Sequence, residues 1–235
     1  MRMVTSMKSF GLGCAAVGLL GLAATDASAT SMTVSGWTLG EQVNVQSDAH
    51  TGWVNTAELD VSYGGQGGFS YCVDLAQSIG AGTSTGWETF GTDTDPGVIR
   101  AAWLVEFARP QFEAILAPDS DGQAWGVTRA TAIAALQVAI WEVIGEAPGQ
   151  YDLYSGEFAV AQDGASQGVM NLARGFLGEL QSRGVDEFET SAIWAYHASR
   201  QDQLVVVNPI PEPSSLILFG AGAGLVAFAA ARKRA

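Results

Sequence analysis

"ATAIAALQVAIWEVI", residues 130–144, decides the fold, because it is the most strongly helical part of the chain. An apolar stripe at helical spacing is formed by Ile133, Leu136, Ile140 and Val143. Ala132, Ala134, Ala135 and Ala139 lie next to these residues in the sequence, which permits close packing around the helix. The stretch therefore predicts a buried helix within a longer helical segment at residues 124–146.

Gln137 is the polar exception inside this apolar block. Its helical neighbours are Ala134, Ile133, Ile140 and Trp141, and none of them pairs well with a primary amide. A buried amide without partners costs about 1–3 kcal/mol. Three readings are open: Gln137 bonds to backbone at a sheet edge, faces water, or has undergone a reaction that removes its amide.

Strand-like segments lie on both sides of the helical block, and together they predict an α+β fold with a β-sandwich or barrel-like sheet and an inserted helical subdomain. Strands are expected within residues 31–39, 41–46, 56–63, 68–75, 86–92, 187–199 and 202–208. Helices are expected at residues 97–108, 124–146 and 166–183. Asp95 and Pro96 fit the start of the first helix, and Pro110 is expected to mark its end.

Cys72 lies in "FSYCVDLAQ", residues 69–77, and is the one cysteine expected in the mature protein, because Cys14 falls in an N-terminal export signal. Strand alternation places Cys72 on one face with Asp74, and Tyr71 on the other. A thiol can attack a glutamine carboxamide and release ammonia. The resulting thioester would remove the free thiol and the buried amide of Gln137 together.

"YCVDL" followed by "AALQVAIWEV" resembles the Cys-Gln thioester domain of bacterial surface adhesins. Tyr71 and Cys72 match the aromatic-Cys element of that family. The second element, a Gln-x-Ala-Ile-Trp-like helix, is matched by Gln137, Ala139, Ile140 and Trp141. The family's usual threonine before the glutamine is Leu136 here. The resemblance covers roughly residues 69–145.

That resemblance implies a Cys72–Gln137 thioester that forms an amide bond once with an amine on a surface or matrix partner, such as a protein lysine or an amino sugar. It implies a covalent adhesin, without enzymatic turnover and without a cofactor. Tyr71 and Trp141 are expected to exclude water, which would hydrolyse the bond. Asp74 and Glu142 are the candidate proton acceptors for the incoming amine.

Two other function classes remain open at this stage. Cys72 with His197 or His50 would suit a cysteine-dependent hydrolase or transamidase. Alternatively, the chain would be a non-reactive structural protein of the extracellular matrix. The two histidines and Cys72 lack metal-ligand spacing, so no metal site is expected.

The charge balance excludes nucleic-acid partners. Eleven basic residues against 24 acidic ones give a net charge of −13. Without a basic patch there is no means of releasing counterions from a phosphate backbone.

The two ends of the chain predict export and anchoring. Residues 1–29 have the basic start, apolar run and small-residue cleavage site of a signal peptide. Residues 208–235 hold Pro211, Glu212 and Pro213, then an apolar run that is expected to be a transmembrane helix, then a basic end.

This C-terminal arrangement resembles the PEP-CTERM sorting signal, which implies processing by an exosortase. The predicted route is an exported precursor anchored in the inner membrane, and then the envelope surface or extracellular matrix. The thioester domain is expected to occupy residues 30–207 between the two signals.

Overall fold

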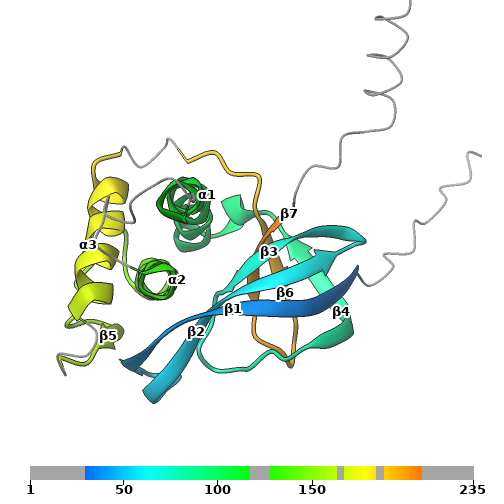
Figure 1. Cartoon of the computed structure of the whole chain (residues 1–235), viewed down its shortest axis with the longest axis horizontal. Helices are drawn as coiled ribbons and strands as arrows, with labels where there is room; N and C mark the ends of the chain where they lie inside the picture. Colours follow the sequence, from blue (N-terminus) through cyan, green and yellow to red (C-terminus); the bar gives the residue numbers. More distant parts are fainter. Residues whose placement is uncertain (1–29, 117–127, 163–166, 184–187, 208–235) are drawn as a thin grey trace, which may run out of the picture.

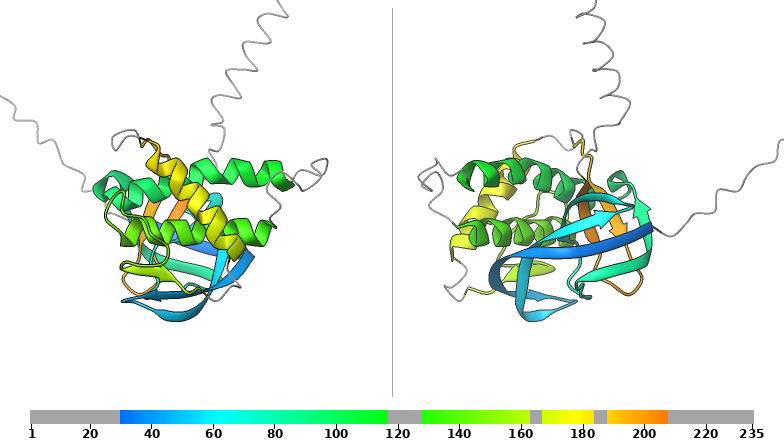
Figure 2. Two further views of the ribbon diagram at one scale, coloured as in Figure 1. Left: turned by 90° about the vertical axis from the view of Figure 1, so that its left-hand side faces the viewer. Right: turned by 45° about the vertical axis from the view of Figure 1, so that its right-hand side comes forward.

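The computed structural model describes residues 30–116, 128–162, 167–183 and 188–207. It is a mixed α+β structure in which three helices lie on one side of an antiparallel sheet (Figures 1 and 2). The predicted signal peptide and the whole C-terminal sorting segment, including Pro211, Glu212 and Pro213, lie outside the described residues. Among the described residues, no helix has the length and apolar character needed to cross a membrane.

The sheet has seven strands in the order β2-β3-β7-β6-β4-β1-β5, all antiparallel to their neighbours. The strands are β1 Thr30–Ser47, β2 Thr51–Tyr63, β3 Gln66–Cys72, β4 Gly82–Phe90, β5 Phe158–Val160, β6 Ile193–Tyr196 and β7 Gln203–Val207. A further pairing of β2 with β1 closes six of the strands into a ring. The barrel-like form is therefore the one adopted, rather than a sandwich.

Strand β1 is long enough to take part in two different surfaces. Its first half pairs with β4 and β2, and its second half pairs with β2 and β5. The register with β2 shifts between Val34 and Gly36 and again between Leu39 and Gln42. Such irregularities bend a strand, which lets the β1–β2 pair curve from the barrel towards the helices.

The helices are α1 Pro96–Leu116, α2 Arg129–Gly145 and α3 Gln167–Gln181, with a short 3-10 turn η1 at Thr92–Thr94. Asp95 starts α1 as predicted: its carboxylate accepts the backbone N–H groups of Gly97 and Val98. The expected end at Pro110 is wrong, because α1 continues through it to Leu116. Gln111 donates its side-chain amide to the Phe107 carbonyl, which supports the backbone beside the proline.

Two apolar cores hold the molecule together. The smaller one joins side chains of the closed ring, including Met32, Leu59 and Trp87. The larger one joins all three helices to the sheet, with Val43, Tyr71 and Leu204 contributed by strands. The helices are inserted between β4 and β6, but they share this core with the strands and are not a separate subdomain.

Helix α2 lies at the centre of the larger core, as its sequence predicts. Every residue from Thr131 to Val143 is buried. Thr128 caps its N-terminus by accepting the Thr131 N–H. Close approach of β1 to α2 depends on Gly40: a Cβ there would overlap Thr56 Oγ1 and lie 3.0 Å from the Ala134 backbone nitrogen.

Candidate functional site at the end of strand β3

Cys72 is the last residue of β3, at a place where one neighbouring strand leaves. On one side, β3 remains paired with β7 through the Cys72–Gln203 pair, and Val73 N–H donates to Asp202 O over 2.8 Å. On the other side, the pairing with β2 stops at Ser70. Backbone groups alternate in direction along a strand, so the N–H and C=O of Cys72 face the side that β2 has vacated.

The Gln137 carboxamide occupies this vacant position. Cys72 N–H donates to Gln137 Oε1 over 3.1 Å, and Gln137 Nε2 donates to the Cys72 carbonyl over 2.7 Å. The side chain thus pairs with the backbone as a strand would. Gln137 is fully buried, and this contact joins residues 65 positions apart in the chain. Of the three readings open from the sequence, backbone pairing at a sheet edge describes this contact.

The Cys72 thiol has neutral hydrogen-bond partners, and the Asp74 carboxylate is near enough to act on it electrostatically. Gln203 Nε2 donates to Cys72 Sγ over 3.6 Å, and Ser70 Oγ donates to Gln203 Oε1 over 2.9 Å. Burial raises the pKa of Cys72 to about 12. The side chain is therefore a neutral thiol at physiological pH. Sequence reasoning missed Gln203, because a glutamine at the start of a strand gives no sign of what it faces.

Three other predicted site residues lie on α2 and are buried. Trp141 and Ile140 follow Gln137 by one helical turn and share its side of the helix. Ala139 belongs to the surrounding core. The Trp141 indole Nε1 is buried without a hydrogen-bond partner among the described residues.

Tyr71 points to the opposite face of β3, into an ionic cluster that sequence reasoning did not find. Its hydroxyl donates to Glu58 Oε2 over 2.8 Å. Arg109 Nε lies 2.8 Å from the same oxygen, and Arg129 lies 3.0 Å from Glu58 Oε1. Arg109 also stacks over the Phe69 ring at 4.8 Å. The polar end of Tyr71 is thus committed to this cluster.

The two candidate proton acceptors have different surroundings. Asp74 lies just beyond Cys72, and its carboxylate accepts backbone N–H groups from Ala76, Gln77 and Asp202. These bonds shape the loop after β3. Glu142 lies five residues after Gln137, roughly 140° around the helix, and is fully buried. Burial raises the pKa of Glu142 to about 8.

The two histidines occupy separate places. His197 Nε2 lies 3.1 Å from the Thr85 carbonyl, and its Nδ1 accepts the Ser199 N–H, so both ring nitrogens are engaged. His50 lies in the turn between β1 and β2, and its Nε2 is buried without a partner among the described residues. Within the described ranges, no group of three or more His, Cys, Asp or Glu residues could hold a metal ion.

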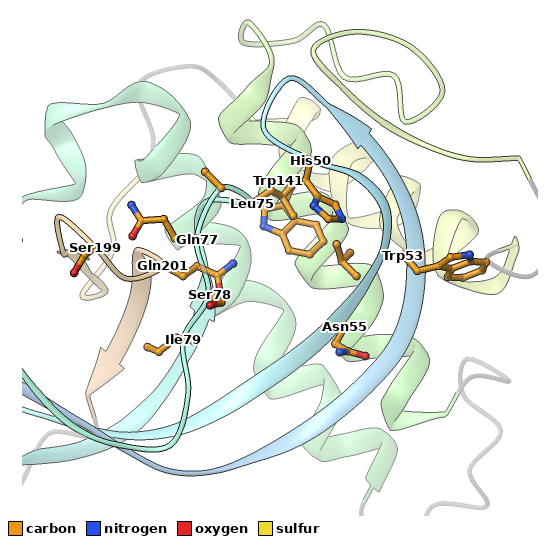
Figure 3. A pocket seen from close by; sticks show the side chains of 12 residues that line it. His50, Trp53, Asn55, Leu75, Gln77, Ser78, Ile79, Trp141, Ser199 and Gln201 are labelled. Carbon is orange, nitrogen blue, oxygen red and sulfur yellow. The ribbon is translucent and has the colours of Figure 1, made fainter.

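A pocket of about 800 Å³ is lined by residues of α2 and of the loop after β3, among others (Figure 3). Its wall comes from four segments: the β1–β2 turn and start of β2, the loop after β3, α2, and the β6–β7 turn. Trp141 of α2 and Leu75 of the β3 loop both line it. They lie four residues after Gln137 and three residues after Cys72, respectively, whereas Gln137 and Cys72 themselves do not line the pocket.

Comparison with known proteins identifies one segment of the chain. Residues 209–234 match the PEP-CTERM protein-sorting motif. No curated protein and no solved structure matches the chain. The motif indicates an exported, membrane-anchored precursor that is sorted to the cell surface by an exosortase.

Proposed function

We propose that this exported protein carries an internal thioester between Cys72 Sγ and Gln137 Cδ, and that it uses the bond once to form an amide with an amine on a surface partner. The observation that carries the proposal is the pair of hydrogen bonds that holds the Gln137 carboxamide against Cys72. The sorting motif supports it, because it delivers the domain to the place where such a partner is met.

Formation of the bond would join Cys72 Sγ to the carboxamide that the Cys72 backbone already holds. Cys72 Sγ bonds to Gln137 Cδ, the Cδ–Nε2 bond breaks, and the thiol proton leaves with the nitrogen as ammonia. The Cys72 N–H already donates to Oε1, the oxygen on which negative charge develops during the attack. The Gln203 amide donates to the sulfur and would steady it as charge builds there.

In amine capture, Cys72 Sγ is the leaving group. The amine nitrogen bonds to Gln137 Cδ, the Cδ–Sγ bond breaks, and one amine proton ends on Cys72 Sγ. The high pKa of this thiol favours its return to the protonated form. Burial of Gln137 protects the acyl group from water until the amine arrives.

The Asp74 carboxylate is an unsuitable proton acceptor here because three backbone N–H groups already occupy it. Glu142 lies around the helix from Gln137. The amine must therefore arrive unprotonated, and the rate of capture should rise with pH towards the pKa of the amine, near 10.4 for lysine.

Intact-mass measurement of the purified full-length chain tests the proposal. The thioester predicts a deficit of one ammonia, which methylamine abolishes by adding its own mass and releasing one thiol. Cys72→Ala and Gln137→Ala should each have full mass. Gln167→Ala, at an exposed glutamine of α3, is the matched control and should keep the deficit.

A chain of full mass with a titratable Cys72 thiol would contradict the thioester. The Gln137 contact would then be a non-reactive latch between α2 and β3, as expected of a structural matrix protein. A cysteine-dependent hydrolase or transamidase would instead show repeated turnover that survives Gln137→Ala.

A further inference from the structure

The pocket that Leu75 and Trp141 help to line has, among the described residues of its wall, no acidic or basic side chain other than His50. Among the described residues that line it there is no Asp, Glu, Lys or Arg. Its polar groups are the amides of Asn55, Gln77 and Gln201, the hydroxyls of Ser78 and Ser199, the imidazole of His50 and the indole N–H groups of Trp53 and Trp141. This neutrality is unexpected in a chain of net charge −13.

Three lining residues hold buried polar atoms without a hydrogen-bond partner among the described residues. They are His50 Nε2, Gln77 Oε1 and Trp141 Nε1. The indole N–H is a donor, the amide oxygen is an acceptor, and the imidazole nitrogen is either. Unpaired buried groups of this kind cost about 1–3 kcal/mol each, and a bound ligand is one way of satisfying them.

Figure 3 places Gln77, Gln201 and Ser199 on one side of the pocket, and His50, Trp141 and Asn55 on the other. The indole of Trp141 lies in the wall near His50. Trp53 lies at the rim, with its ring turned away from Trp141. A ligand that fits must offer an apolar face to the rings and hydroxyl groups to the amides.

We propose that this pocket binds a sugar unit of an amino-sugar polymer and presents its free amine to Gln137. A sugar ring has an apolar C–H face that packs on an indole, and hydroxyl groups that both donate to and accept from amides. The volume of about 800 Å³ lies in the ordinary range for small-molecule pockets, roughly 300–1,000 Å³. This assignment rests on the thioester proposed above and names its substrate class.

The neutral lining also distinguishes a sugar from other amines. A lysine-rich peptide or a polyamine carries several positive charges, and the pocket supplies no carboxylate to pair with them. An amino sugar loses less binding free energy in this pocket, because most of its recognition comes from hydroxyl groups. Its amine reacts when deprotonated, which is also its neutral form.

The test uses full-length protein in detergent and three probes at equal amine concentration. They are a glucosamine oligosaccharide, methylamine and a lysine-containing peptide. The rate of adduct formation is followed by intact mass. We expect the oligosaccharide to react at least about tenfold faster than the other two, because binding raises its local concentration. Equal rates, or a faster peptide, would overturn the proposal.

Ala76→Trp fills the pocket at an exposed lining position without replacing either reacting group. We expect this variant to retain the ammonia deficit, and its oligosaccharide rate to fall about tenfold relative to its own methylamine rate. Ala147→Trp, at an exposed position outside the pocket, is the matched control. An unchanged oligosaccharide rate in Ala76→Trp would show that the pocket is not the binding site.

A binding measurement separates failure of the pocket from failure of the thioester. Cys72→Ala cannot form the bond, yet it should still bind an N-acetylglucosamine oligosaccharide and shift the Trp fluorescence or the tryptophan NMR signals. Binding without an ammonia deficit in the wild-type chain would retain the sugar site and reject the thioester. An ammonia deficit without sugar binding would retain the thioester and reject the sugar site.

Discussion

Tyr71 and Cys72 are neighbours on β3, yet they join two buried arrangements of opposite kinds. On the Tyr71 face, Glu58 is paired with two arginines and a phenol, so its charge is compensated. On the Cys72 face, the Gln137 carboxamide pairs with the Cys72 backbone through two hydrogen bonds between neutral groups. The difference teaches that one strand separates an ionic cluster from a neutral contact.

The largest effect is expected from removing the centre of the ionic face. Glu58→Leu leaves Arg109 and Arg129 without their shared carboxylate, in a place where Glu58 is 3% exposed. We expect a loss of about 4 kcal/mol in the free energy of unfolding. Chemical denaturation measures it. Asp60→Leu, at an exposed acidic position of the same strand, is the control and should be nearly neutral.

Glu142 is a second buried carboxylate, which can be compared with the ion-paired Glu58. Burial raises the pKa of Glu142 from 4.5 to about 8, so the native state holds a proton that the unfolded state releases. Stability should therefore fall as pH rises from about 4.5 to about 8 and level off above that.

The expected loss between pH 6 and pH 8.5 is on the order of 2 kcal/mol, and Glu142→Gln should remove it. Thermal unfolding of both proteins across this range provides the measurement. An equal pH slope in the variant would assign the dependence to other groups.

Two substitutions disrupt the neutral contact, and they differ in whether the Cys72 backbone keeps its hydrogen-bond partners. Cys72→Ala and Gln137→Leu both prevent a thioester, but only Gln137→Leu leaves the Cys72 N–H and C=O without their partners. We expect Gln137→Leu to be less stable than Cys72→Ala by about 2 kcal/mol. Denaturant titration compares them. Equal free energies of unfolding in the two variants would mean that these two hydrogen bonds do not contribute to stability.

The smallest effect is expected where β1 approaches the helix that carries Gln137. Gly40→Ala places a methyl group against Thr56 and the α2 backbone, and should cost about 1 kcal/mol by crowding. Gly67→Ala is the matched control, because its Cβ meets nothing within 4 Å. If Gly40→Ala loses the ammonia deficit while its free energy of unfolding falls by no more than about 1 kcal/mol, α2 must be positioned closely for the proposed reaction.

Much of the neutral face could be predicted from the sequence. The apolar block around Gln137 gives a buried helix, and strand alternation places Cys72 opposite Tyr71. What could not be predicted is that β2 leaves β3 after Ser70, since strand registry depends on contacts far apart in the chain. That departure is what opens the position taken by the Gln137 amide.

The ionic face could not be predicted, for a related reason. In "TAELDVSY" the alternation assigns Glu58 to the outer side of the strand, where a carboxylate would meet water. The helices cover that outer side, so Glu58 and Leu59 are both buried. When both faces of a strand are covered, alternation no longer predicts which side chains are exposed. The burial of Glu58 therefore leaves no signal in the local sequence.

The place of β7 in the sheet has a mechanical consequence. This strand ends at Val207, two residues before the sorting motif, and is held between β3 and β6. Tension between a partner joined to Gln137 and a C-terminal anchor would pull β7 along its own axis. The hydrogen bonds on both sides would then be loaded together in shear, rather than opened one at a time. With the amide bond proposed above, load applied at the α2–β3 junction would reach the C-terminal end of β7 through these hydrogen bonds.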